Sequence, residues 1–508
     1  MKYLISILIS VLIFLSHGIS SAQPYYVSPS GSDSNTGTIS SPFLTIGKAV
    51  TKVSAGQTIY LRGGTYNLTS TITISKSGTA SAYINLFAYQ SERPVLNFSG
   101  QAFGSRGVQL SGSYWHVKGI DITMAGDNGL YIGGGNYNVI EYCSFYRNKD
   151  SGLQLGSGSA YDTIRNCDSY FNADPTDYGD ADGFAVKMDV GTGNYFYGCR
   201  SWRNCDDGWD GYLRGTDDVS TTIVNCWAFE NGYFEDGTDA GVNANGNGFK
   251  MGGSDDKTLK HNFTLKQCLA FNNKAKGFDQ NNNQGSMTLY NCSGYNNIVA
   301  NYRIKTTLTD ASKKLIVKNC LDLDNDAEIG SFAIQEKNSW LLYTIGSSDF
   351  VSVDTSGVRA RRKSDGSLPD ITYMHLAPGD RMIDAGVNVG LPYAGSAPDL
   401  GCFETNLTGV DKIYSTSEIV YYPNPVISTM TIHMELLRGG HCEAALFDMS
   451  GRFMRMIIDE DIEPGEFSLT SDFSDMKDGL YICRININGV RIASGKIMKM
   501  GTSTPVMK

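Results

Sequence analysis

The sequence has little of what helical, histidine-based or nucleic-acid-binding proteins need. Its 508 residues include six histidines and 13 prolines, and apolar residues do not recur at helical spacing over long stretches. The formal net charge of −10 argues against nucleic acid as a partner, since such binding depends on Lys and Arg at phosphates. No second apolar span follows the N-terminal one, so we expect no transmembrane helix in the mature chain.

Glycine and hydrogen-bonding residues are abundant instead. There are 57 glycines, and Asn, Ser and Tyr are frequent, a composition typical of short strands joined by tight turns. Hydrophobic residues make up 41%, which is enough for a folded core and excludes a disordered chain. A chain of this length predicts more than one domain. The expected fold class is all-β.

Residues 1–22 have the pattern of a secretory signal peptide. Lys2 precedes an apolar run that ends at Leu15, and small residues precede Gln23. The alternative, a membrane anchor, is disfavoured because the run is too short. We therefore predict an exported, extracellular protein.

A repeat dominates the middle of the chain. A cysteine followed five residues later by an asparagine occurs at Cys143/Asn148, Cys167/Asn172, Cys199/Asn204, Cys226/Asn231, Cys268/Asn273, Cys292/Asn297 and Cys320/Asn325. Spacings that begin in the low twenties, with short β-type segments between turns, are typical of a solenoid, here a parallel β-helix. We expect the cysteines to form a buried column of free thiols and the asparagines a hydrogen-bonded ladder. A disulfide framework is the alternative.

A glycine step after most repeats allows successive coils to be aligned. One residue before this glycine, the coils carry Asp182 and Asp207, which should lie on adjacent rungs about 4.8 Å apart. Asp206 and Asp210 flank Asp207 on the same rung. Lys250 falls one rung beyond Asp210, in the same column. The register therefore predicts four carboxylates and one amine on one outer face.

These residue types indicate a cation site with a base beside it. Crowded carboxylates raise each other's pKa unless a cation offsets them, and calcium prefers six to eight oxygen ligands. No histidine lies between Asp182 and Lys250, which disfavours zinc and excludes a histidine triad there. A cation beside a neutral lysine suits β-elimination from a uronic acid, in which the base removes the C5 proton. The alternative is that Asp-Asp-Gly is an ordinary turn and the lysine is solvated.

Four carboxylates and one Ca²⁺ would leave a net charge of −2, which repels an acidic polymer. We therefore expect nearby cations to compensate; the candidates are Lys187, Arg214, Lys276 and Arg303, which together with Asp279 are the predicted substrate-binding residues. Asp279 falls beside Lys250, where a free carboxylate would raise the pKa of the lysine.

The chain divides by pattern into four segments. After the signal peptide, residues 23–405 should form the parallel β-helix, with a short capping helix at 46–53. Residues 406–419 form a polar linker, and residues 420–508 a small antiparallel β-sandwich. We expect a monomer.

Four motifs resemble polysaccharide lyase family 9, the right-handed β-helix pectate lyases. They are Asp-Gly-Phe-Ala-Val-Lys (182–187), Asp-Asp-Gly-Trp-Asp (206–210), Gly-Asn-Gly-Phe-Lys (246–250) and Gly-Phe-Asp-Gln-Asn-Asn (277–282). The resemblance implies a pectin substrate, Lys250 as Brønsted base, and as calcium ligands Asp182, Asp206, Asp207 and Asp210.

The C-terminal segment resembles the type IX secretion sorting domain of Bacteroidetes. The motifs are Tyr-Pro-Asn-Pro (422–425), Met-Ser-Gly-Arg (449–452) and Gly-Lys-Ile-Met-Lys (495–499). This implies the type IX secretion machinery as a partner, and a protein that is secreted or attached to the outer-membrane surface. An immunoglobulin-like module that binds carbohydrate is the alternative.

Four functions remain open from the sequence. The leading hypothesis is a calcium-dependent pectate lyase, and a rhamnogalacturonan I lyase with the same mechanism is the nearest alternative. A polygalacturonase-type hydrolase is disfavoured because the Asn-Thr-Asp and Gly-His-Gly segments of that family are absent. A non-catalytic β-helix adhesin would explain the solenoid, but not Lys250 in register with the acids.

Overall fold

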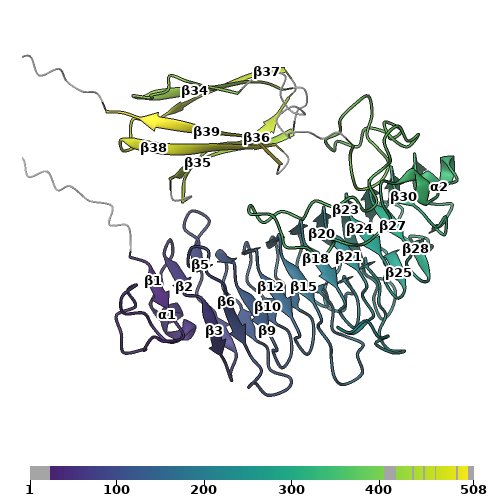
Figure 1. The fold of residues 1–508 in the computed structure, drawn as a ribbon, viewed down its shortest axis with the longest axis horizontal. Helices are drawn as coiled ribbons and strands as arrows, with labels where there is room; N and C mark the ends of the chain where they lie inside the picture. Colours follow the sequence, from purple (N-terminus) through teal and green to yellow (C-terminus); the bar gives the residue numbers. More distant parts are fainter. Residues whose placement is uncertain are drawn as a thin grey trace, which may run out of the picture. The chain divides into compact units, whose positions relative to one another are not determined.

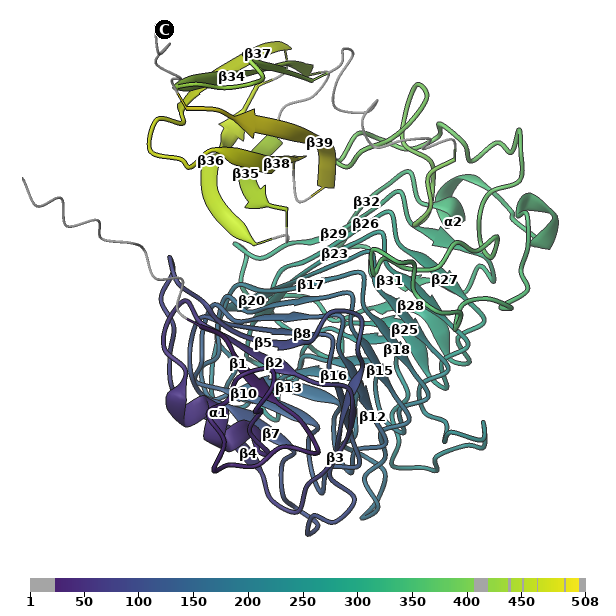
Figure 2. The same cartoon turned by 60° about the vertical axis from the view of Figure 1, so that its left-hand side comes forward.

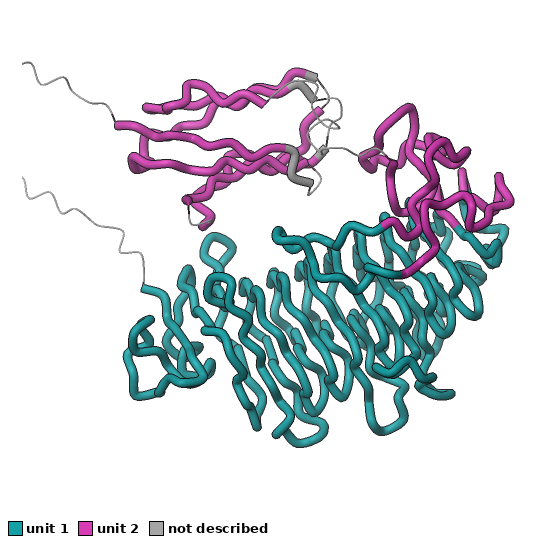
Figure 3. The backbone as a smooth tube through the Cα atoms, in the orientation of Figure 1, with its two compact units in different colours: residues 1–317, 322–335, 356–371 teal, residues 318–321, 336–355, 372–508 magenta. Residues whose placement is uncertain are grey.

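The computed structural model describes residues 23–405, 419–436, 440–449, 452–463, 465–487 and 490–501. The predicted signal peptide and residues 406–418 of the predicted linker lie outside these residues. The chain forms two compact units (Figure 3). Among the described residues, the first unit holds 23–317, 322–335 and 356–371, and the second holds the remainder.

The first unit is a parallel β-helix, in which the chain winds through three sheets once per coil (Figures 1 and 2). The first sheet has twelve strands in the order β1 (Tyr25–Val27), β2 (Thr58–Leu61), β5 (Ile84–Ala88), β8 (Trp115–Lys118), β11 (Val139–Glu141), β14 (Thr163–Arg165), β17 (Asn194–Tyr197), β20 (Val219–Val224), β23 (His261–Lys266), β26 (Met287–Tyr290), β29 (Leu315–Lys318) and β32 (Ile334–Glu336). The predicted fold is confirmed.

Each of the other two sheets has ten strands. The second sheet contains β4 (Ile72–Ile74), β7 (Val108–Leu110), β10 (Leu130–Gly133), β13 (Leu153–Gly156), β16 (Phe184–Val186), β19 (Trp209–Asp210), β22 (Phe249–Lys250), β25 (Lys276–Asp279), β28 (Ala300–Ile304) and β31 (Glu328–Ile329). The third contains β3 (Gly64–Asn67), β6 (Pro94–Asn97), β9 (Asp121–Thr123), β12 (Ser144–Tyr146), β15 (Asp168–Tyr170), β18 (Arg200–Trp202), β21 (Trp227–Phe229), β24 (Leu269–Phe271), β27 (Ser293–Tyr295) and β30 (Leu321–Asp322).

In the interior of the coils, similar side chains from successive coils stack on one another. On the second sheet, Phe184, Trp209, Phe249 and Phe278 lie in one column, with successive ring centroids 4.8, 4.8 and 5.2 Å apart. These rings are almost completely buried. Offset stacking adds to the burial of apolar area, so the column fixes the register of the outward-facing residues beside it.

The cysteines of the repeat are buried and form no disulfide, as predicted. All eleven cysteines of the chain are free thiols in the structure. Their Sγ atoms hydrogen-bond mostly to backbone carbonyls; that of Cys199, for example, lies 3.5 Å from the carbonyl oxygen of Ile164. They act as small apolar residues at a corner of the coil, and the alternative disulfide framework is wrong.

The predicted asparagine ladder forms over six coils. Each side-chain Nδ2 donates to the Oδ1 of the next asparagine at 2.8–3.0 Å, in the order Asn148, Asn172, Asn204, Asn231, Asn273 and Asn297. The seventh predicted member, Asn325, is exposed, and Asn297 donates instead to Asn301 at 2.6 Å. The coils become irregular at this end, so the cysteine–asparagine spacing no longer places the asparagine at the corner of a coil.

Replacing Asn204 by alanine should lower the free energy of unfolding by about 2–4 kcal/mol. The change removes one acceptor of Asn172 Nδ2 and the side-chain donor to Asn231 Oδ1, and both atoms are buried where water cannot replace the lost bonds. Urea unfolding would measure the loss, with Asn243→Ala at an exposed loop position as the control. A change below about 0.5 kcal/mol would mean that the ladder does not stabilise the coils.

Helix α1 (Ile46–Lys52) covers the first coil, as predicted. Its N-cap is Thr45, whose Oγ1 accepts a hydrogen bond from the backbone N–H of Lys48 at 3.2 Å. Its Ile46, Ala49 and Val50 are buried, so the helix shields the open apolar end of the solenoid. The short helices α2 (Ser339–Leu342) and η1 (Ser347–Asp349) lie after the last complete coils.

The C-terminal residues form two antiparallel sheets, which confirms the predicted β-sandwich. One contains β33 (Val420–Tyr422), β34 (Thr429–Leu436) and β37 (Gly465–Asp472). The other has the order β36 (Phe453–Ile462), β35 (Gly440–Asp448), β38 (Gly479–Ile487) and β39 (Val490–Lys499). Buried side chains of both sheets, including Ile432, Leu446 and Ile485, make one core. Among the described residues, no helix has the length and apolar character needed to cross a membrane.

Candidate active site and cation cage

Three successive strands of the second sheet carry the predicted site. β16, β19 and β22 pair in parallel, so that Ala185, Asp210 and Lys250 are directly opposite one another on adjacent rungs. Asp279 of β25 follows on the next rung. The register deduced from the glycine step is therefore confirmed.

Three aspartates converge where the chain enters these strands. Asp182, Asp207 and Asp210 each place a carboxylate oxygen within 4.8 Å of the other two, and all three are buried. Asp182 Oδ1 accepts the backbone N–H of Asp207 at 3.2 Å, and Asp207 Oδ1 accepts the backbone N–H and Nδ2 of Asn247, both at 2.8 Å. The coil backbone therefore holds the cluster in place. We call these three residues the acidic cage.

Asp206 lies beside the cage and holds a loop. Its Oδ1 accepts the backbone N–H of Asn245 at 2.5 Å, and its Oδ2 accepts Asn245 Nδ2 at 3.3 Å. Its carboxylate is not one of the three that converge within 4.8 Å. Asp206 therefore ties the long segment before β22 to the rung that carries the cage.

Two lysines enter the cage from different sides. Lys250 Nζ lies 3.0 Å from Asp207 Oδ2 and 3.4 Å from Asp210 Oδ1. Lys187 Nζ lies 2.7 Å from Asp182 Oδ2 and 3.5 Å from Asp210 Oδ2. The two oxygens of Asp210 thus face different ammonium groups. Only 5% of the Lys187 side chain and 11% of the Lys250 side chain are exposed.

Burial and mutual repulsion control the ionisation of the site. Burial raises the pKa of Asp182 well above its usual range, and the charges of Asp210 and Asp207 raise it further. Although burial opposes the charged form of Lys250, the carboxylates of Asp207 and Asp210 hold its pKa well above the ordinary lysine value. Without a competing cation, Lys250 is therefore an ammonium and not a base.

The residues present fit a hard divalent cation. All donors in the cage are carboxylate oxygens, with no His or Cys among them, which suits calcium better than zinc. Asp207 Oδ2 is buried and accepts no hydrogen bond, so one oxygen of the cage is satisfied only by the charge of Lys250. Such an atom is a natural ligand position, because an unpaired buried oxygen is costly.

The predicted substrate-binding residue Arg214 lies at the rim of the site. Its Nε is 3.2 Å from Asp255 Oδ2, and its guanidinium lies 5.7 Å from the ring centroid of Tyr212. The Tyr212 hydroxyl donates to Asp255 Oδ1 at 2.7 Å, and Lys250 Nζ lies 5.6 Å from the same ring. Sequence reasoning missed Tyr212 and Asp255; the only signal was their position shortly after Asp210 and Lys250.

Three of the other predicted substrate residues lie on the rungs after Lys250. Lys276 Nζ pairs with Asp279 Oδ2 at 2.9 Å, and Arg303 pairs with Glu328 at 3.4 Å. Asp279 lies opposite Lys250 in the register, as predicted, and its carboxylate is not free because it pairs with Lys276. Lys187 is buried inside the cage, where its ammonium contacts carboxylates and not an open surface.

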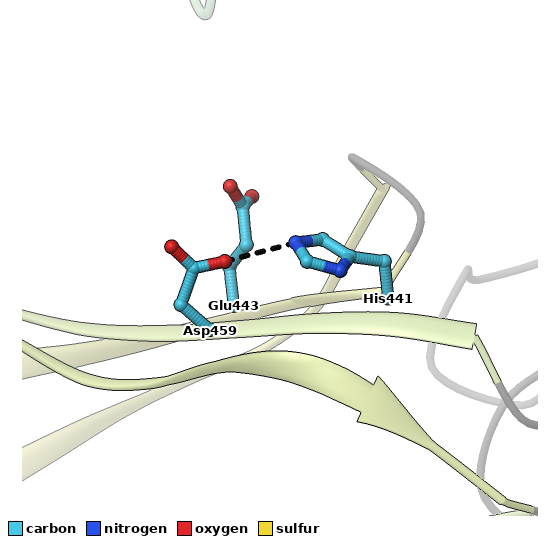
Figure 4. A group of neighbouring side chains, drawn as sticks. All are labelled: His441, Glu443 and Asp459. Carbon is cyan, nitrogen blue, oxygen red and sulfur yellow. Dashed lines mark hydrogen bonds and ion pairs between the residues drawn. The ribbon is translucent and has the colours of Figure 1, made fainter.

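A second group of metal-ligating side chains lies in the sandwich (Figure 4). His441 and Glu443 of β35 face Asp459 of β36, and His441 Nε2 lies 2.9 Å from Asp459 Oδ1. The other ring nitrogen of His441 lies 3.0 Å from Asp461 Oδ1. The side chains of His441 and Asp459 are about half exposed, and the imidazole is already engaged by carboxylates. The buried cage on the β-helix is therefore the better candidate metal centre.

The fold, the site and the similarity to known proteins define a polysaccharide lyase. The chain belongs to the family described as Pel9A-like, right handed beta helix region, which matches residues 25–327. Pectate lyase L of Dickeya chrysanthemi is 38% identical over 407 residues, covering 77% of this chain and 93% of the relative.

Two solved structures are also similar to this chain. The crystal structure of pectate lyase Pel9A superposes with a TM-score of 0.70 at 38% identity, covering 77% of this chain and 98% of that one. A rhamnogalacturonan lyase superposes with a TM-score of 0.60 at 25% identity, covering 70% and 97%. The resemblance deduced from the four motifs is confirmed.

The C-terminal sandwich matches a different family from the β-helix. Residues 420–499 match the secretion system C-terminal sorting domain. This confirms the resemblance to a sorting domain over the alternative of a carbohydrate-binding module. The protein is therefore secreted or exposed at the cell surface.

Proposed function

We propose that the protein is a calcium-dependent pectate lyase that cleaves polygalacturonate by β-elimination, with Lys250 as the base. The observation that carries the proposal is the position of Lys250 Nζ, 3.0 Å and 3.4 Å from two carboxylates of a buried oxygen-only cage. The names of the relatives, pectate lyase L and pectate lyase Pel9A, support the substrate class.

In this proposal Asp182, Asp206, Asp207 and Asp210 hold the calcium ion. Bound calcium supplies positive charge that stabilises the carbanion-like transition state at a uronate carboxylate. The backbone N–H of Asp207 and the amide of Asn247 orient two of the carboxylates before any ligand arrives. Because these carboxylates are already oriented, they do not need to reorganise during the reaction.

Lys250 then accepts the proton from C5 of the sugar. Its amine lies at the rim of the cage on the outer face of the second sheet, with 11% of the side chain exposed. The ring of Tyr212 beside it limits access of water. As the electron pair of the C5–H bond forms the C4=C5 double bond, the C4–O bond breaks and the leaving oxygen takes up a proton from solvent.

Charged side chains along the second sheet provide the polymer-binding surface. Arg214 is 57% exposed beside Lys250 and can exchange Asp255 for a sugar carboxylate. Lys276, Asp279 and Arg303 extend the surface over the next two rungs. Arg binds carboxylates through two parallel hydrogen bonds, which favours an acidic polymer at this edge.

The direct test follows the new double bond by ultraviolet absorbance with purified polygalacturonate. We expect a signal that requires calcium and disappears with a chelator. Absence of any signal from both polygalacturonate and rhamnogalacturonan I, with the fold intact, would overturn the lyase assignment for pectin. Saturated products would instead indicate hydrolysis.

A rhamnogalacturonan I lyase is the second candidate. The similarity to a solved rhamnogalacturonan lyase over 70% of this chain favours it, although the identity is 25% against 38% for pectate lyase Pel9A. Both polymers contain galacturonate, so the same base and cation would serve. Comparing turnover on the two polymers under one condition separates the candidates.

Calcium binding should release protons, because the carboxylates that raise the pKa of Lys250 would be neutralised by the ion. Between the raised pKa of the ion-free protein and the lower pKa of the loaded one, Lys250 loses its proton on binding. We expect up to about one proton released per calcium at alkaline pH. Calorimetry in two buffers of different ionisation enthalpy measures this number. Lys250→Met should release fewer protons than the wild type, since only the cage carboxyl groups with a raised pKa could then release one, and an equal release in that variant would contradict the assignment.

A further inference from the structure

The cage contacts a second cation, the ammonium of Lys187. Lys187 follows β16 and reaches back to Asp182, to which it donates at 2.7 Å. It also lies 3.5 Å from Asp210 Oδ2 and 3.4 Å from the backbone carbonyl of Asp180. Because its side chain is only 5% exposed, this charge cannot be screened by water as a surface lysine would be.

Lys187 and Lys250 differ in their freedom to leave the cage. Lys250 lies against two carboxylates and the ring of Tyr212, on the outer face of the sheet. Lys187 is held by a carboxylate and a backbone carbonyl, and Asp150 on the preceding rung adds a further acidic neighbour. An ion that enters the cage would displace the amine of Lys250 and leave Lys187 in place.

We propose that Lys187 is a built-in counter-charge of the calcium cage, which weakens calcium binding and makes the loaded site acceptable to a polyanion. This inference rests on the proposed function. With one Ca²⁺, four carboxylates and a neutral Lys250, the site carries a net charge of about −2 without Lys187 and about −1 with it. The lysine therefore compensates for part of the repulsion that a galacturonate polymer would meet.

A purely structural role for Lys187 predicts the opposite effect on calcium. If the lysine only positioned Asp182, its loss would disorder the cage and weaken calcium binding. If it acts as a counter-charge, its loss removes a repulsion from the ion at short distance, and calcium should bind more tightly. The sign of the change in affinity separates the two roles.

The test compares the full-length protein with Lys187→Met, which keeps the length of the side chain without its charge. We expect the calcium dissociation constant, measured by calorimetry without substrate, to fall about tenfold or more. At saturating calcium, KM for polygalacturonate should rise several-fold, with a larger effect on KM than on kcat. Lys266→Met on the first sheet, a half-buried lysine away from the cage, is the charge-matched control and should change neither value.

Weaker or unchanged calcium binding in folded Lys187→Met would overturn the proposal. If that variant does not fold without calcium, the measurement is made on Lys187→Gln instead. The quantity measured is the rise in its thermal unfolding midpoint when calcium is added. A larger rise than in the wild type supports the counter-charge, and an equal or smaller rise overturns it. Wild-type protein that binds no calcium would refute the proposed function itself, whereas normal calcium-dependent turnover with the wrong sign in the variants would refute only this inference.

Discussion

Lys250→Met is expected to reduce turnover of polygalacturonate by about 10³-fold or more at saturating calcium. General bases contribute roughly 10²–10⁴-fold to rates, and no other amine lies against both Asp207 and Asp210 from the outer face of the described coils. The substitution removes a charge that competes with calcium, so the affinity for calcium should stay equal or increase. Initial rates from ultraviolet absorbance, together with calorimetry, measure the two effects separately.

One control variant and the exclusion of one alternative base make the result for Lys250 specific. Lys276→Met removes a lysine one rung away that pairs with Asp279, and it should alter KM more than kcat. His261 is the nearest alternative base by sequence. It is buried, bonded to Thr221 and the carbonyl of Gly211, and its pKa is lowered to about 4 by burial. If Lys250→Met keeps more than a tenth of the wild-type rate, the proton acceptor is a different group.

Asp207→Asn should weaken calcium binding by about 100-fold and make turnover depend on much higher calcium concentrations. Asp207 Oδ2 is the buried oxygen without a hydrogen bond, so the change removes a charged ligand while its Oδ1 can still accept from Asn247. The loss of one charge beside a divalent ion in a buried site costs several kcal/mol, which corresponds to at least this factor. Calorimetry with calcium alone gives the affinity directly.

Asp162→Asn is the matched control for the cage variant. Asp162 is also buried, and burial raises its pKa to about 8, so near neutral pH it is largely uncharged and the amide resembles it. It precedes β14 on the first sheet and accepts the backbone N–H of Asn138 at 2.8 Å. Calcium affinity should be unchanged in this variant. Equal calcium affinity in the Asp207 and Asp162 variants would mean that the cage is not the calcium site.

The fold could be predicted because its repeat is local in sequence. One buried cysteine and one asparagine per coil mark the same corner each time, and stacking then fixes which residues meet on adjacent rungs. The prediction was wrong at Asn325, where the spacing is right but the side chain is exposed. Beyond the last regular coils no following rung imposes the corner geometry, so sequence phase alone does not place the side chain.

The site was predicted to the level of rungs but not of contacts. The column that contains Asp210 and Lys250 follows from a parallel register, which has a period of one coil. The direction in which each side chain points does not follow from that register. Asp279 lies opposite Lys250 as predicted, but its carboxylate pairs with Lys276, three residues earlier on its own strand. Arg214 was named without Asp255 or Tyr212, which lie around it.

The sequence by itself determined the solenoid, the order of its rungs and the placing of Asp182, Asp207, Asp210 and Lys250 on neighbouring rungs, because each of these follows from a repeat with a fixed period. Tertiary structure alone decided the charge balance of the site. In the folded chain the ammonium of Lys187 contacts the cage, and the carboxylate of Asp279 pairs with Lys276. One carboxylate oxygen of Asp207 accepts no hydrogen bond. The physical reason is that burial and pairing depend on side-chain direction and on the loops between coils, which have no period.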